Sequence, residues 1–265
     1  MIILAMHGIL TGREDITWPE RFETYAWLNF PDFRVLVDHY AAGPWPRINW
    51  MLGNPKLARG QAIRMLNWVQ QGKGGGRLAL VGHSNGCEIV RQTAMMLAAA
   101  GAVIDCLVLI APPIHPDLDR NGLQDLLDNG SLGRVVCYAS PIDKVMARRL
   151  SWNPVTWFQH VVRWPYGNAG RVGLDRGECL TEDQQMAAGT RVATRWWPRY
   201  GHSTWFSPAV SHQTFDLILS DAQLDPQTLR LLAETTEACG PCAGAKQIES
   251  ANRKAATHVP INTAH

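Results

Sequence analysis

The sequence predicts an α/β protein whose mostly parallel central sheet is covered by helices on both faces. Several apolar runs lack the alternation of a half-exposed strand, among them Leu78 to Val81 and Cys106 to Ile110, and such runs are typical of strands buried on both faces. Segments with helical spacing separate them, which favours a parallel sheet. With 265 residues, of which 46% are hydrophobic and 18% charged, the chain suits one sizeable domain.

Each expected element rests on its apolar spacing and on the glycine or proline residues that bound it. The expected strands are Ile2 to Met6, Phe33 to Val37, Leu78 to Val81, Cys106 to Ile110, Arg134 to Tyr138 and Thr190 to Trp197. The first expected helix, Asp15 to Asn29, has apolar positions at Ile16, Phe22, Trp27 and Leu28 and has Pro19 in its first turn. The second, Leu57 to Gln71, is expected to turn Ile63 and Leu66 inward. A third helix follows Gly86, with Ile89, Ala94 and Leu97 at helical spacing, and a closing helix contains Phe215 to Leu219.

The five residues Gly82-His83-Ser84-Asn85-Gly86 join the central strand to the helix that follows it. Glycine lacks a side chain, so the flanking backbone can approach closely while Ser84 is held at the tip of the turn. The main-chain N–H of Asn85 then lies at a helix start, where the dipole and the unpaired donors favour developing negative charge. We therefore predict that Ser84 is a nucleophile and that Asn85 contributes to an oxyanion hole.

A Gly-x-Ser-x-Gly turn between a strand and a helix resembles the nucleophile elbow of the α/β-hydrolase family. The resemblance covers residues 1 to 220, and because the family's two earliest strands have no counterpart, the chain is similar to the minimal, small-lipase version of the fold. The loop His7-Gly8-Ile9 resembles the family's His-Gly loop. The resemblance implies that Ile9 supplies the second oxyanion N–H, and we expect His7 itself to bond nearby backbone.

A serine hydroxyl needs a histidine base and an acid that orients the base. The family's order is Ser, acid, His, and the resemblance therefore implies that Asp143, after the strand Arg134 to Tyr138, is the acid and that His202, after the strand ending near Trp197, is the base. Asp143 could instead cap a following helix. The fallback acids are Asp175, Glu178 and Asp183, and the competing histidines His160, His212 and His115 lie away from a strand's carboxyl end or precede the acid.

Two irregular segments carry tryptophans and follow strand ends. The first runs from His39 to Pro55 and holds Trp45, and the second, residues 145–177, holds Trp152 and Trp157. In open parallel sheets ligands bind outside the carboxyl ends of the strands. We therefore expect these three tryptophans to bind the substrate, with 145–177 as a small cap insert before the last strand. The alternative is that the aromatic residues seal the edge of the sheet.

The catalytic domain is expected to span residues 1–222, followed by a polar C-terminal tail, 223–265. The tail contains Cys239-Gly240-Pro241-Cys242, the letters of a thioredoxin-type redox pair. That chemistry requires a strand before the motif, and the residues before Cys239 show no strand pattern. A local disulfide or two unpaired thiols is the expected state of this pair.

Composition and charge exclude several classes of function. The chain has 25 basic and 23 acidic residues, a net charge of +2, which does not indicate a nucleic-acid surface. No apolar segment approaches the roughly 20 residues needed to span a bilayer, and the start lacks the positive region of a signal peptide. We therefore expect a soluble, cytoplasmic protein with no metal and no cofactor. The sequence leaves its oligomeric state open.

The expected function is that of a serine hydrolase that cleaves acyl esters of a small molecule through an acyl-enzyme. The same three side chains would also serve a thioesterase, an amidase or an acyltransferase. A non-catalytic binding module on this fold is a further alternative, because fold alone does not fix function.

Overall fold

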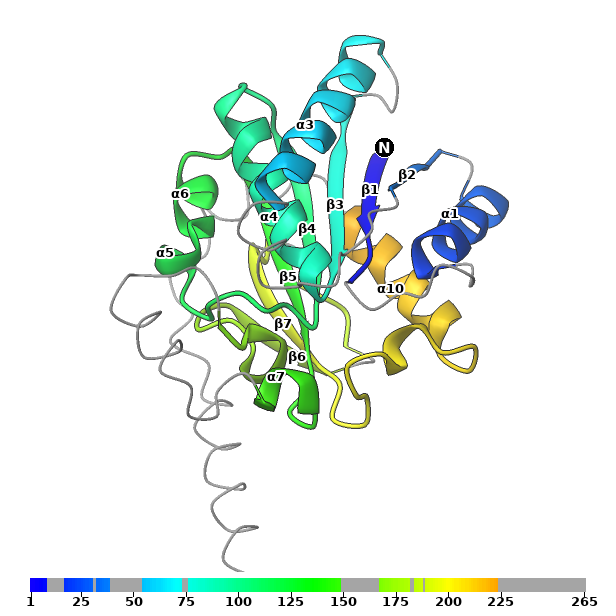
Figure 1. The fold of residues 1–265 in the computed structure, drawn as a ribbon, viewed down its shortest axis with the longest axis vertical. Helices are drawn as coiled ribbons and strands as arrows, with labels where there is room; N and C mark the ends of the chain where they lie inside the picture. The colour runs from blue at the N-terminus through cyan, green and yellow to red at the C-terminus, as the bar shows by residue number, and fades with distance from the viewer. Residues whose placement is uncertain are drawn as a thin grey trace, which may run out of the picture.

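The computed structural model describes residues 1–8, 17–30, 32–38, 54–72, 76–148, 167–181, 184–187 and 189–223 (Figure 1). The strands are β1 (Ile2–Met6), β2 (Arg34–Asp38), β3 (Leu78–His83), β4 (Ile104–Ile110), β5 (Leu132–Ala139), β6 (Glu178–Thr181) and β7 (Val192–Trp196). The helices are α1 (Trp18–Asn29), α3 (Asn54–Gln70), α4 (Asn85–Ala99), α5 (Leu118–Asn121), α6 (Leu123–Asp128), α7 (Lys144–Arg148), α9 (Ala169–Val172), the short 3-10 helix η3 (Thr204–Phe206) and α10 (Ser211–Gln223).

The seven strands of the described residues form one sheet in the order β2-β1-β3-β4-β5-β7-β6. Every neighbouring pair is parallel, which confirms the predicted parallel sheet. All the carboxyl ends therefore lie at one edge. Strand β3 lies between β1 and β4, and all six of its residues are buried.

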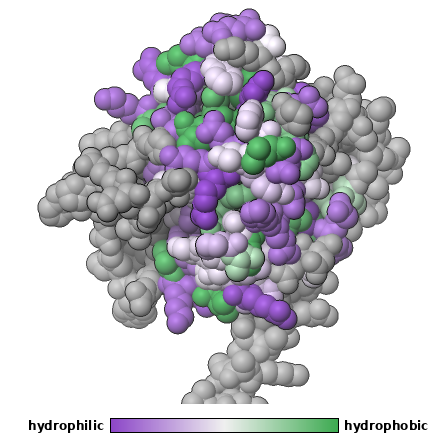
Figure 2. All heavy atoms as spheres, turned by 90° about the vertical axis from the view of Figure 1, so that its right-hand side faces the viewer, coloured by the Kyte–Doolittle hydropathy of each residue, from purple (hydrophilic) through white to green (hydrophobic). Residues whose placement is uncertain are grey.

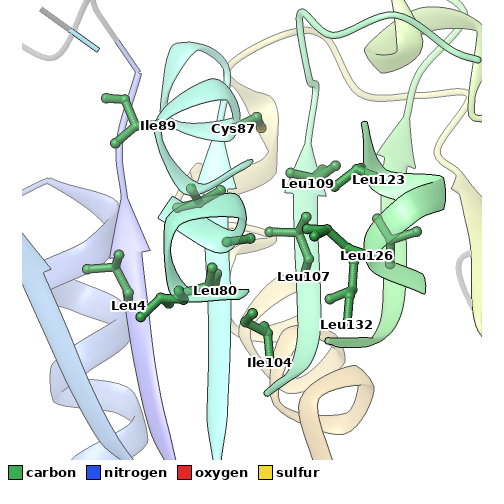
Figure 3. Packing of buried hydrophobic residues seen from close by; sticks show 14 of the residues in the cluster. Leu4, Leu80, Cys87, Ile89, Ile104, Leu107, Leu109, Leu123, Leu126 and Leu132 are labelled. Carbon is green, nitrogen blue, oxygen red and sulfur yellow. The ribbon is translucent and has the colours of Figure 1, made fainter. Parts of the chain in front are cut away.

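Helices cover both faces of the sheet, with α3 and α4 on one side and α1 and α10 on the other (Figure 1). Successive side chains of a strand point to opposite faces. On the α4 side Leu80, Leu107 and Ile89 belong to one cluster of buried residues (Figure 3), and on the opposite side Val108 belongs to one cluster with Phe215. Because neither face is exposed to water, the strand sequences show no alternation.

Helix α1 exposes two of the apolar residues on which its prediction was based. Pro19 lies in the first turn as predicted, but Trp27 and Leu28 are 65% and 66% exposed. The helix buries Trp18, Phe22 and Ala26 instead. These residues recur every fourth position and form one stripe, so Trp27 and Leu28 lie on the other side of the helix.

A similar correction applies to α3. Ile63 was expected to point inward and is 52% exposed, because the buried stripe of the helix is formed by Ala58, Gln61, Ala62 and Met65. The small alanines let α3 approach α4 closely. Large apolar residues were therefore a poor guide to which face of this helix is buried.

Strand β6, at Glu178–Thr181, was not predicted. It pairs only with β7 at the edge of the sheet, and Leu180 alone of its four residues is buried. An edge strand with one buried side chain gives no apolar run. Strand β6 follows the segment 145–177. In that segment, α7 and α9 lie within the described part of the chain, whereas Trp152 and Trp157 lie outside it.

The outer surface of the α1 and α10 side carries hydrophobic residues scattered between hydrophilic ones, on the part of this face that the structure describes (Figure 2). Within the described ranges, none of the helices has both the length and the apolar character that crossing a bilayer requires.

The structure describes four of the six cysteines, and three of these four are buried. Cys87, Cys106 and Cys137 are buried free thiols, as expected, and Cys179 is free and exposed. Burial raises the pKa of the Cys106 thiol to about 12, and the pKa of Cys87 is also raised, first by burial. These buried thiols stay protonated and pack as small hydrophobes. Cys239 and Cys242, with nearly all of the expected tail 223–265, lie outside the described residues.

Candidate active site

The turn from β3 to α4 holds Ser84 in a strained backbone conformation. Its φ is 53° and its ψ is −125°, values that a non-glycine residue rarely adopts. Its N–H donates to the Ile110 carbonyl at 2.9 Å, and its own carbonyl accepts from the Cys87 N–H at 3.0 Å. These main-chain bonds fix the strained residue between β3, β4 and the first turn of α4.

The two glycines of the turn are required by close backbone contacts. A Cβ atom on Gly86 would lie 2.4 Å from the Met6 carbonyl oxygen, and one on Gly82 would lie 2.6 Å from the Cys87 nitrogen. Both distances are far below van der Waals contact. The close approach inferred from the sequence is therefore present, and it brings the end of β1 against the first turn of α4.

Ser84, His202 and Asp143 form a chain of two hydrogen bonds. His202 Nε2 lies 2.8 Å from Ser84 Oγ, and His202 Nδ1 lies 2.8 Å from Asp143 Oδ2. The Asp143 side chain is fully buried, and that of His202 is 11% exposed. Because an ionised carboxylate only accepts, Nδ1 carries the proton and Nε2 is left to accept from the serine hydroxyl.

The second oxygen of Asp143 caps helix α7. Oδ1 accepts from the N–H groups of Val145 and Met146 at 2.9 and 3.0 Å. The capping alternative raised by the sequence is thus also present, with one oxygen serving each contact. The cap fixes the carboxylate so that Oδ2 points to His202.

The competing candidates that the structure describes have other contacts. His115 accepts through Nδ1 from the Asp117 N–H at 3.1 Å, and His212 makes an edge contact with the Tyr25 ring. Asp175 Oδ1 accepts from the Leu118 N–H at 3.4 Å. Glu178 lies on the edge strand β6, and His160 and Asp183 lie outside the described residues.

His202 reaches Ser84 from a distant strand. Strand β7 is three places from β3 in the sheet, a separation of about 14 Å at roughly 4.8 Å per strand. The loop after β7 must therefore cross back over the sheet edge. Ser140 Oγ donates to the Tyr200 carbonyl, and the rings of Trp197 and Trp205 pack against Tyr200 with centroids 4.7 and 5.6 Å away. These contacts hold the loop in place.

The expected oxyanion donors are described in part. Asn85 is the first residue of α4 and is buried, and the first N–H groups of a helix have no intrahelical acceptor. Ile9 lies outside the described residues. The preceding residue, Gly8, lies against Ser84, since a Cβ atom on Gly8 would lie 2.9 Å from Ser84 Cβ. His7 donates from Nδ1 to the Gly8 carbonyl at 2.6 Å, a local backbone bond of the kind expected for it.

The substrate-binding prediction concerns residues that the structure does not describe. Trp45, Trp152 and Trp157 all lie outside the described ranges. Among the described residues, no three His, Cys, Asp or Glu side chains are grouped so that they could hold a metal ion.

A parallel sheet whose central strand turns through a strained serine into a helix is the framework of the nucleophile elbow. The fold is of the α/β-hydrolase type. It places the loops that follow β1, β3, β5 and β7 at one edge of the sheet, and these loops carry Gly8, Ser84, Asp143 and His202.

Comparison with known proteins gives no matching family model and no matching curated protein. Among solved structures, an uncharacterized protein from Bacillus cereus has a TM-score of 0.44 at 11% identity over 89% of this chain, which spans only 60% of that protein's length. A Pyrococcus furiosus esterase has a TM-score of 0.41 at 13% identity, with 86% of this chain and 82% of the esterase covered. The NocB thioesterase domain, in covalent complex with a fluorophosphonate nocardicin G analogue, has a TM-score of 0.42 at 17% identity, covering 82% of this chain and 92% of the domain. At these scores the similarities carry no inference about activity.

One residue beside the site, His83, had no role predicted for it from the sequence. It is the last residue of β3, is buried, and donates from Nε2 to the His202 carbonyl at 2.8 Å. Burial, reinforced by the nearby His202, lowers the pKa of His83 to about 3. The ring is therefore neutral near pH 7 and links the elbow to the His202 loop. Its position inside the Gly-His-Ser-Asn-Gly turn was the available signal.

We expect acid to destabilise the protein through His83. Its folded pKa of about 3 lies below the ordinary value of 6.5, so between these two values the unfolded chain binds the extra proton and stability falls as the pH falls. From pH 7 to pH 5 the loss attributable to this ring is about 1–2 kcal/mol. Urea unfolding of the wild type and of His83→Gln at both pH values measures it. The variant should lose less stability, and equal pH dependence in the two proteins would contradict the assignment.

Proposed function

We propose that this protein is a serine hydrolase that cleaves acyl esters through a covalent acyl-enzyme. The observation that supports the proposal is the Ser84–His202–Asp143 hydrogen-bond chain on the strained elbow, with 2.8 Å at each contact. A neutral serine hydroxyl is a weak nucleophile, and a hydrogen-bonded imidazole oriented by a buried carboxylate is the means of activating it.

In the proposed reaction, Ser84 Oγ attacks the ester carbonyl while His202 Nε2 accepts the hydroxyl proton. The carbonyl oxygen becomes an oxyanion, which the N–H groups of Asn85 and Ile9 would stabilise. The tetrahedral intermediate collapses, and His202 returns the proton to the leaving alcohol. Water, activated by the same imidazole, then cleaves the acyl-enzyme and regenerates Ser84. Asp143 keeps Nδ1 protonated and stabilises the imidazolium that forms transiently.

Turnover of p-nitrophenyl acetate and butyrate, together with labelling by a fluorophosphonate probe, tests the proposal. We expect ester turnover above the buffer rate and one equivalent of probe on the peptide that contains Ser84. Thioester and anilide substrates, and an added alcohol acceptor, distinguish an esterase from a thioesterase, an amidase or an acyltransferase. A folded protein that neither turns over these substrates nor takes up the probe would indicate the binding-module alternative.

We further propose that Trp45, Trp152 and Trp157 line the acyl pocket. Removing one aromatic wall by Trp152→Ala or Trp157→Ala should lower kcat/KM for the longer p-nitrophenyl esters by about tenfold relative to the acetate, because each buried methylene contributes about 0.8 kcal/mol. Kinetics over a series of acyl lengths, beside thermal melts, measure this change.

The matched control is Trp27→Ala, since this tryptophan lies on α1 and is 65% exposed. The control should keep the acyl-length profile of the wild type. If Trp152→Ala and Trp157→Ala lower the melting temperature strongly but leave the acyl-length profile unchanged, these residues seal the sheet edge and do not form the pocket.

A further inference from the structure

Two buried asparagines form a reciprocal pair beside the elbow. Asn54 Nδ2 donates to Asn85 Oδ1 at 3.0 Å, and Asn85 Nδ2 donates back to Asn54 Oδ1 at 3.2 Å. Each residue is only 2% exposed. Asn85 directly follows Ser84 and begins α4, whereas Asn54 begins α3. The pair thus joins the first turns of two neighbouring helices.

The pairing requires an amide on each side. An amide presents one carbonyl acceptor and an NH₂ donor, so two facing amides satisfy each other. An aspartate at position 54 could accept but not donate, and a leucine could do neither. Away from water, a single replacement leaves a polar group of the partner buried without this bond. The structure therefore commits both side chains to one relative orientation.

We propose that Asn54 is a positioning residue that fixes the orientation of the Asn85 main-chain N–H for stabilisation of the oxyanion. The inference rests on the proposed function, in which Asn85 is one of the two donors. Oxyanion donors act because they are preorganised toward the charge that develops. Because two hydrogen bonds hold the Asn85 side chain, rotation of the peptide unit between Ser84 and Asn85 is restricted.

Helix α3 is suited to hold Asn54 in this way. It packs along α4: Thr93 Oγ1 of α4, which donates to the Ile89 carbonyl of its own helix at 2.8 Å, also lies 3.4 Å from the Ala58 carbonyl of α3. Ala58 is about one turn of α3 beyond Asn54. The irregular segment predicted from His39 to Pro55, in which Trp45 was expected to contact the substrate, includes Asn54. The structure instead places Asn54 and Pro55 in the first turn of α3.

The first test compares Asn54→Leu with Gln61→Leu. Gln61 is a matched control because it is also a buried amide of α3, 2% exposed, but it donates to Asp38 and not to the elbow. Removal of a whole oxyanion donor costs about 10²- to 10³-fold in kcat. A loosened donor should cost less, so we expect Asn54→Leu to lower kcat about tenfold with little change in KM. Inhibition by a trifluoromethyl ketone should weaken by the same factor, and Gln61→Leu should change neither value.

A double variant, Asn54→Leu with Asn85→Leu, separates positioning from folding. Replacing both partners of a buried hydrogen bond by apolar groups of the same shape is nearly neutral for stability. We therefore expect the double variant to regain the melting temperature that Asn54→Leu loses, while kcat stays low. Recovery of kcat together with the melting temperature would show a purely structural pair and overturn the inference.

Amide hydrogen exchange provides a readout that does not depend on turnover. The peptide covering residues 84–90 should exchange faster in Asn54→Leu than in Gln61→Leu. Equal exchange in the two variants would overturn the positioning role even in an active enzyme. If the wild type hydrolyses no ester while exchange still differs, the proposed function fails and the positional coupling of Asn54 to Asn85 stands.

Discussion

Replacement of Ser84 by alanine is expected to abolish ester hydrolysis, with a fall in kcat of about 10⁶-fold. The loss follows because alanine lacks the hydroxyl oxygen that lies 2.8 Å from His202 Nε2. The fold should survive. The Ser84 main-chain bonds to Ile110 and Cys87 do not involve its side chain, and alanine adopts the strained backbone at about the same cost as serine.

Ser131→Ala is the matched control for this experiment. Ser131 precedes β5 at the opposite edge of the sheet, and its carbonyl accepts from the Ile104 N–H while its own N–H donates to Asn129. We expect the control to keep full turnover of p-nitrophenyl butyrate and full labelling by the fluorophosphonate. Near wild-type turnover by a folded Ser84→Ala protein, with an unchanged thermal melt, would refute the mechanism.

The sheet was predictable because its strands are buried on both faces. Runs such as Leu78–Val81 and Cys106–Ile110 have no alternation and no charge, and their short length and β-branched residues favour strands that are covered by helices on both sides. The edge strand β6 was missed because it buries Leu180 alone. The exposed face of α3 was misassigned because that helix buries small residues such as Ala58 and Ala62, which carry little apolar signal. In α1 the buried stripe of Trp18, Phe22 and Ala26 leaves two further large apolar residues, Trp27 and Leu28, on the exposed side.

The residues of the candidate site were predictable to different degrees. Ser84 stands out locally, because its strand, turn and helix are contiguous in the sequence. His202 lies 118 positions from Ser84 and 59 from Asp143, so only the chain order of a known family could pair them. The contacts of His83 and Asn54 depend on loops and helices meeting in space, and no spacing in the sequence encodes them.

Asp143→Asn is expected to lower kcat by about 10⁴-fold while the fold is kept. The amide oxygen can continue to accept from the Val145 and Met146 N–H groups, so the cap of α7 survives. The amide NH₂ then takes the place of Oδ2 opposite His202 Nδ1. Because this NH₂ group can only donate, Nδ1 must be unprotonated to accept its hydrogen bond. The imidazole proton moves to Nε2, which can no longer accept the Ser84 hydroxyl proton.

Comparison with two further variants separates the two contacts of this carboxylate. Asp143→Ala removes the cap as well, so it should lose activity and also about 0.5–2 kcal/mol of stability, measured by urea unfolding. Asp175→Asn is the control for the fallback acid. Burial raises the pKa of Asp175, but its contact is with the Leu118 N–H, and we expect its variant to keep kcat. Full activity in Asp143→Asn, with loss of activity in Asp175→Asn or in a variant of Glu178 or Asp183, would reassign the role of the acid to that residue.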